Sequence, residues 1–242
     1  MANIKIKKNI KKVYIKKFSE ISGFNVWIVD GEYIRNNIDE EFTNCGQYYK
    51  FKFIPKNEFW IDKERNPGEE KYFVESMLVM NRLMSKGVSH KEAVNVANRI
   101  EKKERAKSKL MKRESNIKKI KGNLIKTVYK NIIKKYSNKK IKVWIIKGEL
   151  VRDLFFIDFT EGGHSRVYNF IPENEVWIDD DLSLSERKFV ILHELHERNL
   201  MNKGKKYDDA HKSSSEIEYY CRKHPKKLEG YIKREFKKAE NE

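Results

Sequence analysis

Cysteines and long apolar runs are scarce in this 242-residue chain, and each shortage excludes a class of protein. With two cysteines, Cys45 and Cys221, the chain can build neither a disulfide framework nor a four-cysteine zinc site. No stretch approaches the roughly 18 apolar residues of a membrane-spanning helix. The basic N-terminal residues are not followed by an apolar stretch, so we expect no secretory signal. These absences favour a reducing, cytoplasmic setting.

Acidic residues are also in short supply, since 53 Lys and Arg against 36 Asp and Glu give a net charge of +17. The excess basic charge lies in residues 1–17, 102–147 and 222–238, which look helical. Solvated helix faces are the ordinary explanation for such runs. The alternative is contact with an acidic protein or with nucleic-acid phosphates, independent of base sequence. The residues expected to make that contact are Lys118, Lys119, Lys121, Lys134 and Lys135.

The chain contains one unit twice, at a shift of 117 residues. The clearest match aligns residues 54–62 with 171–179 and includes both a Pro and a Trp. So many matches at one offset indicate a tandem duplication. We therefore expect a degenerate repeat unit at 1–105, a basic helical linker at 106–122 and a second unit at 123–242 that carries a candidate His/Glu site.

Each copy predicts an α+β unit that consists of an N-terminal basic helix, a small antiparallel sheet and a C-terminal helical hairpin. Turn signals at Asp30-Gly31 and Lys147-Gly148 predict β-hairpins that begin with strands at 26–29 and 143–146. The remaining ranges are expected as follows: basic helices at about 5–20 and 117–137, and further strands at about 48–54, 58–62, 166–171 and 175–179.

The helical hairpins carry their own boundary signals. Residues 66–69 and 183–186 are typical of a helix start. Gly87 and Gly204 stand where a left-handed residue would end the first helix, and a second helix is predicted at about 89–105 and 206–222. Both copies therefore predict two antiparallel helices.

The two copies differ most at chemically reactive positions. His193, His196 and Glu197 of the second copy replace Ser76, Val79 and Met80 of the first, and His211 replaces Val94. The residues of the first copy suggest buried positions, and we expect Ser76, Met80 and Val94 to form an apolar contact there. Ionisable groups at such positions need partners or a metal.

His193 and Glu197 are four residues apart and share a helix face. Glu197 lies seven residues before Gly204 and His211 seven after it, so antiparallel helices would bring His193, Glu197 and His211 together. Two imidazoles and one carboxylate suit catalytic Zn²⁺, and Glu194 would be its general base. Surface ion pairs, or a metal-free acid–base site on His193 and Glu197, are the alternatives.

His164 is a further candidate because it follows Gly162-Gly163, which lets the backbone approach a ligand closely. An ordinary loop is the alternative. His196 lies next to Glu197, so His164 and His196 are the possible additional site residues.

The segment His193-Glu194-Leu195-His196-Glu197 resembles the His-Glu-x-x-His helix of zincin metallopeptidases, although Glu197 stands where the second His belongs. The stretches 159–164, 171–179 and 207–211 are similar to short proteins of phages and prophages. Together these resemblances imply a phage-encoded protein of the host cytoplasm that uses a divalent metal to hydrolyse a peptide or phosphoester bond. The alternative is a non-enzymatic basic protein that engages nucleic acid or an acidic host or virion partner.

Overall fold

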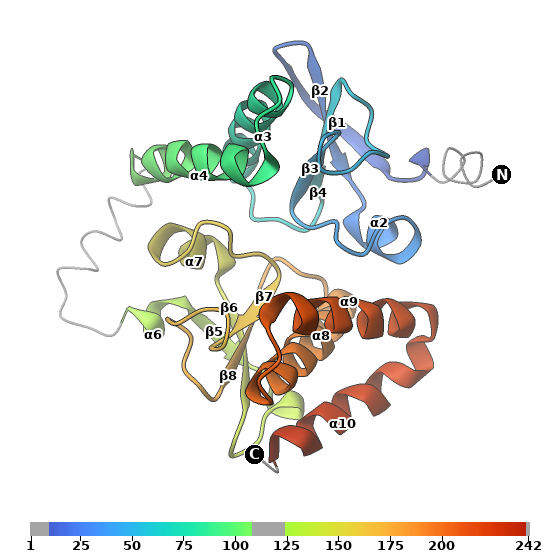
Figure 1. Cartoon of the computed structure of the whole chain (residues 1–242), viewed down its shortest axis with the longest axis vertical. Coiled ribbons are helices and arrows are strands. Elements are labelled where there is room, and N and C mark those ends of the chain that lie inside the picture. Colours follow the sequence, from blue (N-terminus) through green and yellow to red (C-terminus); the bar gives the residue numbers. More distant parts are fainter. Residues whose placement is uncertain (1–9, 108–123, 241–242) are drawn as a thin grey trace. The chain divides into compact units, whose positions relative to one another are not determined.

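A computed structural model describes residues 10–107 and 124–240. The chain divides into two compact units, Met1–Gly122 and Asn123–Glu242 (Figure 1), and each is described by itself. In the part of the chain so described, no helix combines the length and apolar character that a bilayer crossing requires.

The first unit is built on a four-stranded mixed sheet with the strand order β1-β2-β4-β3. The central strands β2 and β4 are parallel and place Trp27 opposite Trp60, whereas β1 and β3 are antiparallel to their neighbours. The strands are β1 (Tyr14–Ile21), β2 (Phe24–Val29), β3 (Cys45–Gln47) and β4 (Glu58–Asp62).

The second unit repeats this sheet in the order β5-β6-β8-β7. Its central pair β6 and β8 is again parallel and aligns Trp144 with Trp177. The strands are β5 (Tyr129–Ile132), β6 (Lys142–Ile146), β7 (Gly162–His164) and β8 (Glu175–Asp179). The same order, directions and register in both units confirm the α+β class and the duplication.

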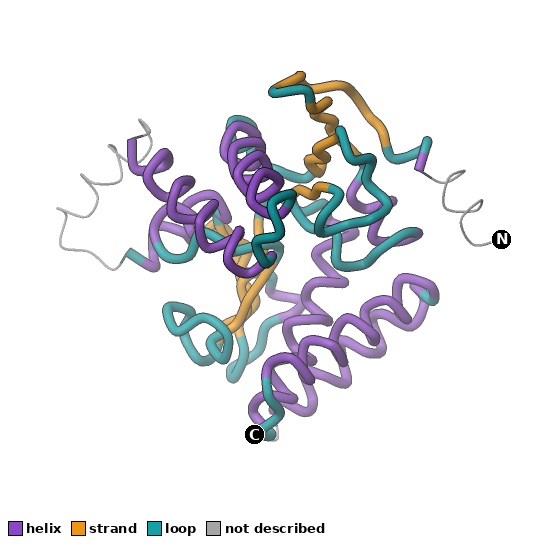
Figure 2. Tube along the Cα trace, turned by 45° about the horizontal axis from the view of Figure 1, so that its top comes forward, coloured by secondary structure: helices purple, strands orange, loops and turns teal. Residues whose placement is uncertain are grey.

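A helical hairpin follows each sheet, as predicted (Figure 2). Gly87 and Gly204 have φ of +86° and +85°, so both occupy the left-handed conformation expected after the first helix of the hairpin. Ser183 caps α8 by accepting a hydrogen bond from Glu186 N, whereas α3 begins without a side-chain cap. The hairpins are α3 (Glu70–Met84) with α4 (His90–Lys107), and α8 (Leu184–Asn202) with α9 (Tyr207–Lys223).

Shorter or peripheral helical segments complete the two units. The basic C-terminal segment is helical, as expected, and forms α10, which packs on α8. The segments are α2 (Gly31–Asn37), α6 (Ile125–Val128), η1 (Lys134–Tyr136), α7 (Gly148–Leu154), η2 (Pro225–Lys227) and α10 (Leu228–Glu240).

The predicted basic helix at the start of each unit is wrong for most of the described residues. In the first unit these residues form the edge strand β1, and in the second the short α6 leads directly into β5. Tyr14 explains the difference, because its ring packs edge-on against Trp27 at 5.0 Å and its hydroxyl donates to Glu58 at 2.8 Å. Tyr129 makes the equivalent hydrogen bond to Glu175 at 2.6 Å. Pairing with the sheet thus overrides a pattern of lysines that also suits an exposed edge strand.

The predicted hairpin turns are also wrong, since the residues after β2 and β6 begin helices α2 and α7. Asp30 caps α2 by accepting a hydrogen bond from Tyr33 N at 3.0 Å, a role that Asp plays as readily as a turn residue. The glycine is required by tertiary contact, because a Cβ on Gly31 would lie 1.7 Å from Asp62 Oδ2. The intervening helix makes the next pairing parallel, so the sheet is mixed rather than antiparallel. The strands expected at 48–54 and 166–171 are turns, and the third strand of each unit lies earlier.

In each unit, a buried ion pair joins the helix that follows the first central strand to the end of the second central strand. Arg35 contacts Asp62 at 2.7 Å in the first unit, and Arg152 contacts Asp179 at 2.8 Å in the second. Trp60 and Trp177, each two residues before one of these aspartates, are fully buried. The Trp and Asp that recur in both copies are therefore part of the scaffold.

Candidate metal centre

The candidate centre lies where helices α8 and α9 face strand β7. Helix α8 contributes His193, Glu194 and Glu197, and α9 contributes His211. His193 and Glu197 share a face of α8 because they are one turn apart. His211 meets them because the hairpin folds at Gly204, as the equal spacing of Glu197 and His211 from that residue predicts.

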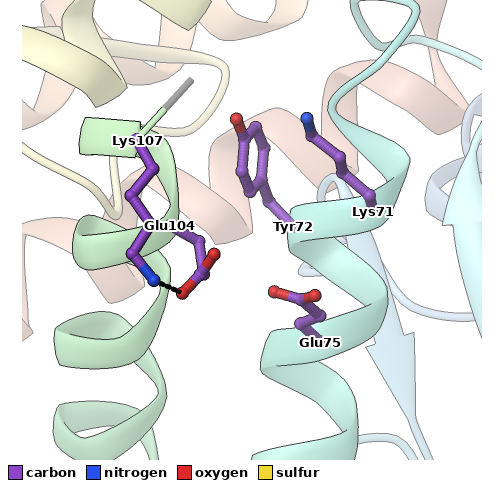
Figure 3. A pocket seen from close by; sticks show the side chains of 5 residues that line it. All are labelled: Lys71, Tyr72, Glu75, Glu104 and Lys107. Atoms are coloured by element: carbon purple, nitrogen blue, oxygen red, sulfur yellow. Dashed lines mark hydrogen bonds and ion pairs between the residues drawn. The ribbon is translucent and has the colours of Figure 1, made fainter. Parts of the chain in front are cut away.

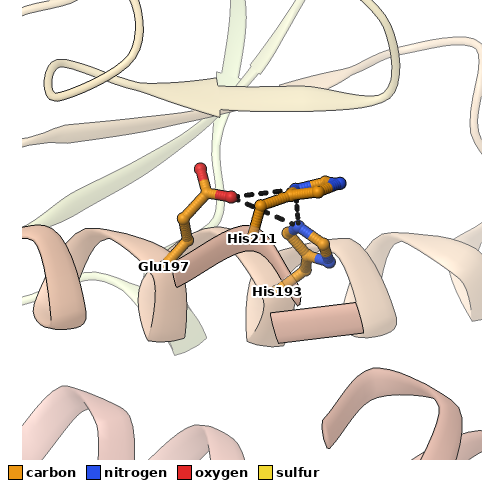
Figure 4. A group of neighbouring side chains, drawn as sticks. All are labelled: His193, Glu197 and His211. Carbon is orange, nitrogen blue, oxygen red and sulfur yellow. Dashed lines mark hydrogen bonds and ion pairs between the residues drawn. The ribbon is translucent and has the colours of Figure 1, made fainter. Parts of the chain in front are cut away.

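The side chains of His193, Glu197 and His211 converge (Figure 4). His211 Nδ1 lies 3.1 Å from His193 Nε2 and 2.9 Å from Glu197 Oε2, and His193 Nε2 is 3.7 Å from that oxygen. Two ligands of a tetrahedral zinc ion, each about 2.0–2.1 Å from the metal, are about 3.4 Å apart. The three observed separations bracket that value, so these atoms fit one small divalent ion.

A buried carboxylate orients the first of these histidines. Glu218 Oε2 lies 2.9 Å from His193 Nδ1, while Glu218 Oε1 accepts a hydrogen bond from Arg222 Nε at 2.9 Å. Arg222 in turn pairs with Glu186 at 2.8 Å. Glu218 thus accepts a hydrogen bond from one ring nitrogen of His193 and directs the other nitrogen to the convergence point, the usual support of a metal-bound histidine.

The first unit contains the same support without the ligands. Arg105 pairs with Glu69 at 2.7 Å and with Glu101 at 2.8 Å. Ser76 occupies the His193 position and donates its hydroxyl to Glu101 at 2.5 Å. The expected apolar contact is therefore wrong at Ser76, because the recurring glutamate supplies a hydrogen-bond acceptor, whereas Met80 does pack against the core.

Sequence reasoning did not single out Glu218, although a signal for it was present. Glu218 lies seven residues after His211, two turns along the same face of α9, and its equivalent Glu101 stands at the same place in the first copy. A carboxylate that recurs in both copies beside a position that changes from Ser to His is the expected mark of such a supporting residue.

His164 approaches the opposite side of Glu197. It is fully buried on β7, and its Nε2 lies 3.1 Å from Glu197 Oε1 and 4.0 Å from Glu194 Oε2. Gly162 makes this possible, because a Cβ there would lie 2.7 Å from Val190 Cγ1 and 3.1 Å from Glu194 Cγ. His164, Glu194 and Glu197 form a second group whose potential ligand atoms lie within 4.8 Å of one another.

The electrostatics centre on an ionised Glu197. Burial alone would raise its pKa, but hydrogen bonds with His164, His193 and His211 hold it far below its usual range. Burial by itself would lower the pKa of His193. The neighbouring Glu197 and Glu218 outweigh burial, so the pKa of His193 is raised well above its usual value. Burial and the charge of Glu197 raise the pKa of Glu194 to about 8. The group therefore presents negative charge that protonated histidine balances and that a metal ion could balance instead.

Burial also lowers the pKa of His164, which keeps its ring neutral despite the neighbouring Glu197. Burial raises the pKa of Glu218, but Arg222 and His193 more than reverse this and lower it to about 2. The carboxylate of Glu218 is therefore charged, whereas the ring of His164 is neutral.

His196 lies apart from both groups. Its Nε2 is 3.1 Å from Ser213 Oγ, and its Nδ1 is 3.0 Å from Glu235 Oε1 on α10. A third acidic group, Asp179 to Asp181, is already engaged, because Arg152 pairs with its first and last members and Lys130 with Asp180.

The residues predicted to contact nucleic acid are only partly covered by the structure. Lys118, Lys119 and Lys121 lie outside the described residues. Lys134 and Lys135 are exposed on η1, and Lys135 Nζ pairs with Glu229 at 2.9 Å. These two lysines are accessible to a phosphate, and one of them already has a carboxylate partner.

The first unit carries a polar hollow between α3 and α4 (Figure 3). It is lined by Lys71, Tyr72, Glu75, Glu104 and Lys107, and the last two pair at 2.7 Å. Four of these residues are charged and the fifth, Tyr72, is buried, and none of them belongs to the His/Glu groups of the second unit.

Comparison with known proteins adds no relative. No protein-family model matches the chain, and neither curated proteins nor solved structures give a match.

Proposed function

We propose that the second unit is a metal-dependent hydrolase whose ion is held by His193, Glu197 and His211. The observation that carries the proposal is the convergence of three ligand atoms at zinc-like separations, with His193 oriented by Glu218. The group can be approached from the side of His211, because 36% of the His211 side chain is exposed. Three protein ligands and an approachable side are typical of catalytic rather than structural zinc.

The remaining carboxyl at the centre is Glu194, the residue that we propose as general base. A bound zinc ion supplies Lewis acidity that activates water for attack on a carbonyl or phosphoryl group. Glu194 follows the ligand His193 directly, and its carboxylate lies within 4.8 Å of that of Glu197, so it is placed to accept a proton near the ion.

Metal binding is tested on the full chain, stripped with a chelator and dialysed against Zn²⁺. We expect one equivalent of bound zinc, measured by mass spectrometry of the metal. The variant His211→Val, which copies Val94 of the first unit, should lose it. His196→Val, which copies Val79, is the matched control and should keep it. Equal zinc content in wild type and His211→Val would remove the site.

Hydrolysis is tested with the zinc-loaded chain against a panel of peptides and phosphodiesters. Glu194→Gln should retain zinc and lose turnover by about 10²-fold or more, because it removes proton transfer but not a ligand. Zinc binding with no turnover of any panel member above the His211→Val background would contradict the hydrolase assignment.

A further inference from the structure

The second His/Glu group raises the question of whether His164 holds an ion of its own. We infer that His164 is instead a positioning residue, which donates its Nε2–H to Glu197 Oε1 and so presents Glu197 Oε2 to the single ion. This inference rests on the proposed function, since it assigns how one ligand of that site is held. The evidence for it is the set of hydrogen-bond partners of the two ring nitrogens of His164.

The backbone decides which nitrogen of His164 bears the proton. Arg166 N–H donates to His164 Nδ1 at 3.2 Å, so Nδ1 must offer a lone pair. A neutral imidazole has one N–H, which then lies on Nε2, 3.1 Å from Glu197 Oε1. Coordination through Nε2 would need the proton on Nδ1, where it would point at the Arg166 N–H. The ring is therefore arranged as a donor.

His193 has the opposite arrangement. Its Nδ1 faces the carboxylate of Glu218 at 2.9 Å, which accepts a hydrogen bond, and its Nε2 faces Glu197 Oε2 and His211 Nδ1. A histidine that donates through one nitrogen to a carboxylate has the other available for a metal. The two histidines thus contact different oxygens of Glu197 and differ in role.

The first unit supports this assignment through Gln47, which occupies the position of His164. Gln47 Oε1 accepts a hydrogen bond from Tyr49 N at 3.1 Å, as His164 Nδ1 does from the residue two positions on. Gln47 Nε2 is a donor, as Nε2–H of His164 is, and points to Met84 Sδ at 3.8 Å. A glutamine therefore accepts the same backbone N–H in the same fold, and it also carries an N–H donor, which in the first unit points to Met84.

Glutamine at position 164 should consequently preserve the function of His164. If the imidazole of His164 were instead a zinc ligand, this substitution would remove the ligand and weaken binding. The test compares the zinc affinity of full-length wild type, His164→Gln and His164→Leu by competition with a chelator. We expect His164→Gln to bind within about threefold of wild type and His164→Leu to bind about 10–100-fold more weakly. Gln47→Leu is the matched control for a buried Leu at this turn and should leave zinc affinity unchanged.

The tautomer is measured directly by long-range ¹H–¹⁵N NMR of the wild-type imidazoles. We expect His164 to be neutral with its proton on Nε2 both before and after zinc is added, while the Nε2 signal of His193 shifts on binding. A zinc-dependent shift of His164 Nε2, two zinc ions per chain, or equal loss in His164→Gln and His164→Leu would overturn the inference. If the chain binds no zinc, the proposed function fails, and the metal-free spectrum still decides whether His164 donates to Glu197.

Discussion

Glu218 joins the candidate metal centre to the scaffold, since one of its oxygens lies 2.9 Å from His193 Nδ1 and the other accepts from Arg222 Nε at 2.9 Å. The first unit keeps the scaffold half of this arrangement in Glu101 and Arg105 but has Ser76 in place of the histidine. The Glu–Arg ion pair is thus common to both units, whereas the His/Glu ligands belong to the second unit.

Glu218→Ala should weaken zinc binding by about 10–100-fold, because His193 loses the acceptor that fixes its ring and its tautomer. Glu101→Ala is the matched control, since it removes the equivalent carboxylate next to Arg105 but lies in the unit without the ligands. Chelator competition measures both affinities. Equal zinc affinities for the two variants would show that Glu218 does not support the site.

Gly162→Ala should destabilise the second unit by about 1–3 kcal/mol, since the new Cβ would lie 2.7 Å from Val190 Cγ1 and force β7 away from α8. Zinc affinity should fall with it, because His164 moves with β7. Gly230→Ala is the control, as a Cβ there meets nothing within 4 Å and helix propensity favours Ala by about 1 kcal/mol. Urea unfolding measures the stability of both variants. If Gly162→Ala were as stable as wild type, the close approach of β7 to α8 at Gly162 would be refuted.

The pH dependence of stability should include a contribution from Glu235 on α10. Burial raises its pKa, but contacts with His196, Lys238 and Asn199 outweigh burial and lower it to about 2, from the usual 4.5. A depressed carboxylate pKa stabilises the fold above the unfolded value, so this contribution is complete above pH 4.5 and is lost as the pH falls towards 2.

Glu235→Gln should therefore cost roughly 2–3 kcal/mol at pH 7 and almost nothing near pH 2, as judged from urea unfolding at several pH values. Glu216→Gln, at an exposed position of α9, should change stability by less than about 0.5 kcal/mol throughout. A constant difference between wild type and Glu235→Gln across this range would contradict the assigned charge.

The alternative of a basic binding protein predicts nucleic-acid binding that is independent of sequence. Between about 50 and 200 mM salt its affinity should fall steeply, because phosphate binding releases counterions. Replacing Lys134 and Lys135 by Ala should lower the salt slope by about one unit for each phosphate that these lysines neutralise. Fluorescence anisotropy with a labelled duplex measures this binding. No binding at about 50 mM salt would remove nucleic acid as the partner in this alternative.

Much of the candidate site followed from local periodicity. The turn of helix between His193 and Glu197 and the equal distances of Glu197 and His211 from Gly204 predict their convergence, because helix geometry and one hairpin turn are enough to align them. The duplication likewise predicted matching units, since equal patterns of turns and core residues specify equal backbones. These signals are local or repeated, and both kinds can be read along the chain.

Tertiary packing decided the remainder. The same residues near Tyr14 suit a basic helix or an edge strand, and contact of that tyrosine with Trp27 and Glu58 selects the strand. Asp30 and Gly31 suit a turn or a helix start, and the space beside Asp62 selects the helix. The roles of the histidines depend on which nitrogen faces which partner across β7, α8 and α9, and residue spacing along the chain carries no information about that orientation.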